Sequence, residues 1–127
     1  MRALMVDDEP IARRVLREEL ERFNDIQIIG EAENGAIALR QIQDLHPPVV
    51  FLDLKMPVMD GFDTISRLQG PSLPAIITLT AYDEFAVSAF EAGAIDYLLK
   101  PVKPVHLRQS IERLHDKSEC AAWPYSG

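Results

Sequence analysis

The regular alternation of short apolar runs with helix-like patterns predicts an α/β fold, in which helices cover both faces of a five-stranded parallel sheet. Five apolar runs are each followed by a segment with apolar residues at helical spacing. The chain has 127 residues and is 47% hydrophobic, which suits one domain with a buried core. Because crossover connections are right-handed, all five strands are expected to share one direction.

The strands are expected where short apolar runs end in polar or turn residues. The runs at 49–53 and 75–80 are apolar almost throughout, which is typical of central strands in a parallel sheet. The run at 26–32 has a mixed pattern and is interpreted as an edge strand. The remaining two strands are expected over 3–6 and 94–99.

Start and stop signals indicate the helices. The residues expected to cap the start of a helix are Asp8, Asn34 and Asp83, and Gly70 and Gly93 are expected to end helices. A last helix is indicated by apolar residues at helical spacing, namely Leu107, Ile111 and Leu114.

Composition limits the class of protein. A net charge of −7 argues against a domain that binds nucleic-acid phosphates by itself. Neither a membrane-spanning run nor a signal-peptide pattern is found, and the single cysteine, Cys120, excludes an internal disulfide. We expect a soluble cytoplasmic protein, with one domain over 1–117 and a tail or linker remnant over 118–127.

Polar residues stand directly after four of the apolar runs. Asp7 and Asp8 follow the first run, Asp53 ends the third, Thr80 ends the fourth and Lys100 follows the fifth. The carboxyl ends of parallel strands meet at one edge of the sheet, where ligands bind. With the strand order 2-1-3-4-5, the first and third strands are neighbours, so the three carboxylates are expected to converge.

These groups suit a divalent cation and a phosphoryl group. Mg²⁺ prefers hard oxygen ligands, so Asp8 and Asp53 are candidate direct ligands, Asp7 a ligand through water, and the Lys55 backbone carbonyl a further ligand. No His or Cys stands beside these carboxylates, which disfavours zinc. The Asp53 carboxylate is also a candidate nucleophile toward phosphorus, with Lys100 supplying positive charge.

The same residues carry a resemblance to a known family. Asp7-Asp8, "FLDLKMPVMDG" around Asp53, Thr80-Ala81 and Lys100-Pro101 follow in order at the spacing of the receiver domain of two-component response regulators. The resemblance covers roughly residues 2–116. It implies a flavodoxin-like (βα)5 three-layer sandwich with strand order 2-1-3-4-5.

The resemblance also implies roles for individual residues. Asp53 resembles the phosphoacceptor, which takes a phosphoryl group from a histidine kinase, and such a receiver catalyses only its own phosphoryl transfer and dephosphorylation. The other implied roles are a Mg²⁺ site at Asp7, Asp8, Asp53 and the Lys55 carbonyl, phosphate-binding and switch positions at Thr80, Ala81, Tyr97 and Lys100, and a cis peptide bond between Lys100 and Pro101.

The stretch over 80–102 is similar to receivers of LytTR-type (LytR/AlgR family) transcriptional regulators. That similarity implies a downstream DNA-binding effector domain, which is expected to be absent from this sequence. It also implies a homodimer formed through the helix over 83–92, the following strand and the last helix. DNA would be contacted only through the effector domain.

Other interpretations stay open. Taken singly, the Asp7-Asp8 pair is also typical of a helix cap, and Asp53 of an ordinary turn. A phosphohydrolase of the haloacid-dehalogenase type also uses an aspartate at a strand end, but it needs a second acid two residues later, where Lys55 stands. A receiver that binds partners without phosphate is a third possibility. Nucleotide binding is disfavoured because no glycine-rich phosphate loop occurs.

Overall fold

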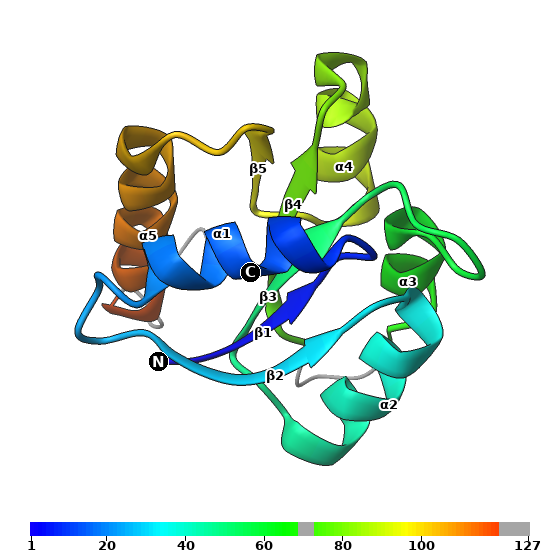
Figure 1. The fold of residues 1–127 in the computed structure, drawn as a ribbon, viewed down its shortest axis with the longest axis horizontal. Coiled ribbons are helices and arrows are strands. Elements are labelled where there is room, and N and C mark those ends of the chain that lie inside the picture. The colour runs from blue at the N-terminus through cyan, green and yellow to red at the C-terminus, as the bar shows by residue number, and fades with distance from the viewer. Residues whose placement is uncertain (69–72, 120–127) are drawn as a thin grey trace.

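Five parallel strands form one sheet in the order β2-β1-β3-β4-β5, which confirms the predicted fold (Figure 1). The computed structural model describes residues 1–68 and 73–119, with side chains up to His115. The strands are β1 (Arg2–Val6), β2 (Gln27–Ala32), β3 (Val49–Asp53), β4 (Ala75–Thr80) and β5 (Asp96–Leu99). The helices are α1 (Pro10–Leu20), α2 (Gly35–Leu45), α3 (Gly61–Ser66), α4 (Ala86–Ala92), which follows a short 3-10 helix over Asp83–Phe85, and α5 (Pro104–Glu119).

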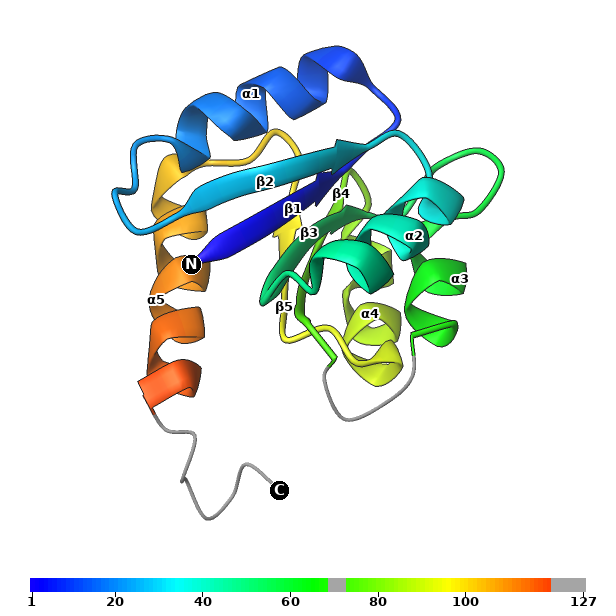
Figure 2. The same cartoon turned by 90° about the horizontal axis from the view of Figure 1, so that it is seen from below.

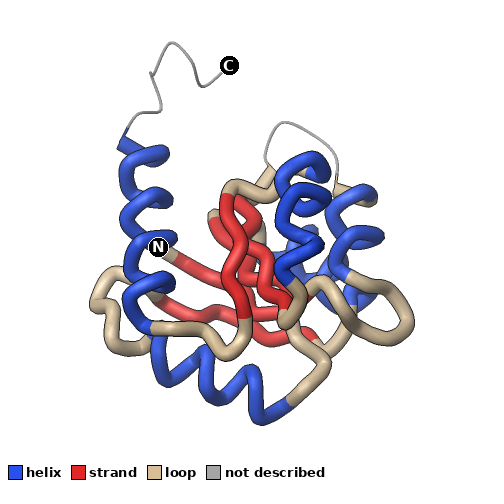
Figure 3. The backbone as a smooth tube through the Cα atoms, turned by 90° about the horizontal axis from the view of Figure 1, so that it is seen from above, coloured by secondary structure: helices blue, strands red, loops and turns tan. Residues whose placement is uncertain are grey.

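The helices make two layers around the sheet (Figure 2). Helices α1 and α5 cover one face, and α2, α3 and α4 cover the other, so the strands lie between helices in the view of Figure 3. Strand side chains alternate between the two sides. Met5 and Phe51 pack with α1 and α5, whereas Leu4 and Val50 pack with α2 and α4. This burial on both faces explains why the central strands are apolar throughout.

The helix boundaries correct two of the expected caps. Asn34 caps α2 as predicted, because its side-chain oxygen accepts a hydrogen bond from the Ile37 N–H at 2.9 Å. The prediction for Asp8 is wrong, since Glu9 is the residue that precedes α1. The prediction for Asp83 is also wrong, because that residue opens the 3-10 helix and α4 begins three residues later.

The glycine predictions have different outcomes. Gly93 ends α4 with a φ of 116°, a left-handed conformation that glycine adopts without steric cost. Gly70 lies outside the described residues. In the part of the chain that the structure describes, no helix is long and apolar enough to span a membrane.

Strand β5 is joined to α5 through a buried carboxylate. The Asp96 side chain accepts hydrogen bonds from the Ser110 hydroxyl at 2.7 Å and from the Tyr97 backbone N–H at 2.9 Å. It also pairs with the Arg113 guanidinium. These partners satisfy a carboxylate that is only 5% exposed, and they fix α5 against the edge of the sheet.

Candidate metal and phosphoryl site

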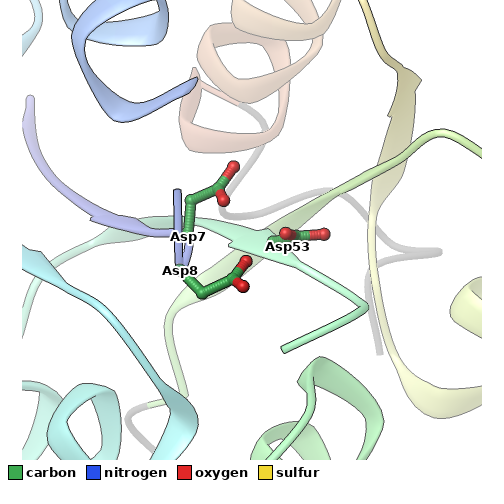
Figure 4. A group of neighbouring side chains, drawn as sticks. All are labelled: Asp7, Asp8 and Asp53. Carbon is green, nitrogen blue, oxygen red and sulfur yellow. The ribbon is translucent and has the colours of Figure 1, made fainter. Parts of the chain in front are cut away.

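Three carboxylates meet at the carboxyl edge of the sheet (Figure 4). Asp7 and Asp8 follow β1, and Asp53 ends β3, which is paired with β1 through Val6 and Leu52. One carboxylate oxygen from each aspartate lies within 4.8 Å of the others. The structure therefore brings together the three acids that the sequence placed at neighbouring strand ends.

The Asp7-Asp8 turn is held by the backbone and side chains around it. The Asp7 N–H donates to the Ala32 carbonyl at 3.0 Å, which continues the pairing of β1 with β2. One Asp7 carboxylate oxygen accepts from the Glu9 N–H at 3.0 Å. The Asp7 backbone carbonyl accepts from Arg13 Nη1 at 2.6 Å, a contact that the sequence did not reveal.

Lys100 supplies the positive charge of the site. Its Nζ lies 2.7 Å from Asp7 Oδ2 and 3.2 Å from Asp53 Oδ2. Burial by itself would lower the pKa of Lys100, but the hydrogen bond that its ammonium donates to Asp7 and the charges of both carboxylates outweigh burial and raise that pKa. The ammonium group is therefore fully charged at neutral pH. The peptide bond between Lys100 and Pro101 is cis.

Asp53 is the carboxylate with the clearest electrostatic perturbation. Burial is the largest cause, and with the negative charge of Asp7 it raises the pKa of Asp53 from 3.8 to about 6, against the opposing effect of Lys100. The Lys100 ammonium therefore does not fully offset the cost of burying the charged Asp53 carboxylate beside Asp7. A divalent cation would offset it, and the three carboxylates supply the hard oxygen ligands that Mg²⁺ prefers. Among the described residues, this is the one group of three or more candidate metal ligands.

Thr80 is buried at the end of β4 and is held by the loop that follows it. Its Oγ1 accepts a hydrogen bond from the Tyr82 N–H at 3.1 Å, and the residue is only 1% exposed. This contact leaves the hydroxyl proton free for donation to another group. Ala81 follows in the exposed part of the same loop, and its role in phosphate binding stays a prediction.

Lys55 follows Asp53 closely and takes part in the site through its backbone. Its N–H donates to Asp53 Oδ1 at 3.2 Å, and the role of its carbonyl as a metal ligand stays a prediction. Its ammonium lies 5.0 Å from the centre of the Phe85 ring and 5.9 Å from that of Tyr82. The side chain is thus placed over the loop between β4 and α4 by cation–π contacts.

Tyr97 does not belong to the acidic cluster. It lies on β5, is half-buried, and packs edge to face against Phe90 of α4 with ring centres 5.8 Å apart. The switch role of Tyr97 stays a prediction.

Gly61 is a further residue of the site that sequence reasoning did not single out. Its N–H donates to the Leu54 carbonyl at 3.1 Å. A Cβ atom at this position would lie 2.5 Å from the Asp53 carbonyl oxygen and 2.8 Å from Leu54 Cα. The close approach of α3 to the end of β3 therefore requires glycine, and the sequence offers only the turn-like "MDG" as a signal.

Comparison with known proteins agrees with the fold. The profile of the response regulator receiver domain matches residues 3–112, and this match covers most of the chain. The chain therefore belongs to the response regulator receiver domain family. This finding confirms the family that the motifs indicated.

The relatives include longer response regulatory proteins. The chain is 45% identical over 112 residues to an uncharacterized response regulatory protein of Vibrio vulnificus, covering 88% of this chain and 46% of the relative. It is 41% identical over 117 residues to the transcriptional regulatory protein BtsR of Escherichia coli, covering 92% of this chain and 49% of that protein. The chain thus spans about half the length of the curated relatives that it matches.

Solved structures show the same fold. The response regulatory domain of mrkE from Klebsiella pneumoniae superposes with a TM-score of 0.86 at 30% identity, covering 94% of this chain and 98% of that chain. The REC domain of AraT from Geobacillus stearothermophilus superposes with a TM-score of 0.83 at 35% identity, covering 95% and 97% of the two chains.

Proposed function

We propose that Asp53 accepts a phosphoryl group from a histidine kinase in a reaction that depends on Mg²⁺. The observation that carries this proposal is the placement of the buried Asp53 carboxylate beside the Lys100 ammonium and within reach of two further aspartates. A nucleophilic carboxylate, a fixed cation and a set of metal ligands are the parts that phosphoryl transfer to an aspartate requires.

The transfer forms one bond and breaks another. An unprotonated Asp53 oxygen attacks phosphorus, the bond from phosphorus to the kinase imidazole nitrogen breaks, and the imidazole leaves with the electron pair of that bond. Lys100 is held between Asp7 and Asp53, so its ammonium can turn toward the phosphoryl oxygens without crossing the site. Its positive charge then favours the product, in which negative charge has moved onto Asp53.

Asp8 and Asp53 would hold Mg²⁺ as direct ligands, with Asp7 acting through water and the Lys55 carbonyl as a further protein ligand. When bound, the ion would neutralise charge on the phosphoryl oxygens. The protein's own contribution is to hold three acids close together at a buried strand edge, at the energetic cost seen in the raised pKa of Asp53.

The response to phosphorylation is proposed to be a shift between two conformations. A phosphoryl group on Asp53 attracts the Thr80 hydroxyl. In the unphosphorylated chain, the oxygen of this hydroxyl accepts a hydrogen bond from the Tyr82 N–H. Movement of Thr80 therefore requires the loop between β4 and α4 to rearrange. Tyr97 packs against Phe90 of α4, and we propose that it follows that rearrangement by turning inward.

The output is proposed to be a homodimer that brings together two LytTR-type DNA-binding domains. Helices α4 and α5 and strand β5 carry exposed apolar side chains that a second copy can bury, namely Val87, Phe90, Leu99 and Val105. The similarity over 80–102 supports the effector class, and the relatives' greater length leaves room for such a domain. Addition of beryllofluoride should increase the sedimentation coefficient, and an unchanged coefficient would contradict the dimer.

The test of phosphoryl acceptance is the intact mass of the chain after incubation with Mg²⁺ and acetyl phosphate. We expect one added phosphoryl group in the wild type and none in Asp53→Asn. A chain that takes no phosphoryl group, although it binds Mg²⁺, would contradict the proposal. We further propose that the chain acts only on its own phosphoryl group, so multiple turnovers of an external phosphate ester would instead support a phosphohydrolase.

A further inference from the structure

Arg13 of α1 holds the Asp7-Asp8 turn through a hydrogen bond. Arg13 stands in the first turn of α1, where its N–H donates to the Glu9 carbonyl at 3.1 Å. From there its Nη1 reaches back to the Asp7 carbonyl at 2.6 Å. This carbonyl belongs to the peptide unit that joins Asp7 to Asp8, so its direction fixes the backbone from which the Asp8 carboxylate projects.

Arg13 is itself held in place by Glu31, the residue before the last position of β2. Its Nε donates to Glu31 Oε1 at 3.1 Å, and the other Glu31 oxygen accepts from Arg17 Nε at 3.1 Å. The Arg17 hydrogen bond lowers the pKa of Glu31, so this carboxylate is charged at neutral pH. Gln41 of α2 donates to the Glu31 backbone carbonyl at 2.9 Å, which fixes the same residue from a second helix.

We propose that Arg13 is a positioning residue for the Mg²⁺ site, kept in its working orientation by Glu31. The proposal rests on the metal site of the proposed function and adds a residue that contacts no metal ligand atom. The other Asp7 contacts hold its N–H and its carboxylate, whereas Arg13 holds its carbonyl. Asp8 is the more exposed acid of the three, and its orientation therefore depends most on the backbone.

The expected effect follows from the behaviour of residues that orient metal ligands. Removal of such a partner commonly weakens metal affinity by about 10-fold to 100-fold. Because Arg13 orients the backbone and not a ligand atom directly, we expect about a 10-fold rise in the Mg²⁺ dissociation constant for Arg13→Met. Arg13→Lys keeps a donor and a charge, so it should recover part of the affinity.

The experiment measures Mg²⁺ affinity by calorimetry and thermal stability without Mg²⁺ on the same samples. Arg14→Met is the matched control, because Arg14 is an exposed neighbour on the same helix and its loss removes the same charge. Glu31→Gln should weaken Mg²⁺ binding in the same direction as Arg13→Met. An Arg13→Met chain that loses thermal stability but keeps the wild-type dissociation constant would overturn the proposal, as would an equal loss of affinity in Arg14→Met.

Intact mass after treatment with acetyl phosphate separates this proposal from the proposed function. If Arg13→Met weakens Mg²⁺ binding but the wild type takes no phosphoryl group, the positioning role stands and phosphoryl acceptance fails. If the wild type is phosphorylated and Arg13→Met binds Mg²⁺ as tightly, the positioning role alone fails. A wild type that binds no Mg²⁺ overturns both.

Discussion

Replacement of Asp53 by asparagine should stabilise the metal-free protein at neutral pH. The folded chain holds the Asp53 carboxyl with a pKa of about 6, against 3.8 for the free side chain. Between these two pH values the folded state binds more protons than the unfolded state. The free energy of unfolding therefore falls as pH rises across this window, and the full cost of the buried charge is present above it.

The size of the effect follows from that difference. A difference of about 2 pKa units corresponds to about 3 kcal/mol of unfavourable free energy in the ionised folded protein. Screening by solvent reduces this unfavourable free energy. The variant also loses the contact of Lys100 with Asp53, which offsets part of the gain in stability. We therefore expect Asp53→Asn to raise the free energy of unfolding by about 2 kcal/mol at pH 7.5.

Urea denaturation of both chains at pH 4 and pH 7.5, with and without Mg²⁺, measures this effect. The gain should be present at pH 7.5 without Mg²⁺ and should nearly vanish at pH 4, where Asp53 is protonated in the folded wild type. Saturating Mg²⁺ should stabilise the wild type and close the gap. Equal stability of both chains at pH 7.5 without Mg²⁺ would refute the electrostatic reasoning.

Two further substitutions test other parts of the site, and a third tests the loop between β3 and α3. Lys100→Gln leaves buried carboxylates without their cation, so it should destabilise the metal-free chain by about 2 kcal/mol at pH 7.5, and urea titrations should show Mg²⁺ reducing that loss. Gly61→Ala forces a Cβ against the Asp53 carbonyl, so it should lower the free energy of unfolding by about 2 kcal/mol and weaken Mg²⁺ binding. An unchanged stability in urea denaturation and an unchanged Mg²⁺ affinity in calorimetry would contradict this. Val58→Gly should stabilise the chain by up to about 1 kcal/mol in urea denaturation. Val58 is 85% exposed, and its φ of 70° strains a β-branched residue. A loss of stability would contradict this.

The fold could be predicted because its signals are local and repeated. The central strands over 49–53 and 75–80 are apolar on both faces, and their observed bounds agree with the expected ones. Asp53 and Thr80 end these strands, so a parallel sheet brings them to one edge without further information. The side chains of the candidate site were therefore recoverable from strand ends alone.

Contacts that depend on how one element is oriented against another were not recoverable. The hydrogen bond from Arg13 to the Asp7 carbonyl depends on the angle between α1 and β1. The hydrogen bond from Arg13 to Glu31 depends on the pairing of β1 with β2. Neither leaves a periodic pattern in the sequence. The predicted cap at Asp8 failed for a related reason, because Asp8 belongs to the acidic cluster and tertiary context overrides a local preference.

The most direct test of the central claim is to locate the phosphoryl group. The chain is treated with acetyl phosphate and Mg²⁺ and reduced with borohydride, which converts an aspartyl phosphate to homoserine, and its peptides are sequenced by mass spectrometry. We predict homoserine at position 53 alone, and none in a sample without Mg²⁺. Homoserine at position 7 or 8, or none at any position, would contradict the assignment of Asp53 as the phosphoacceptor.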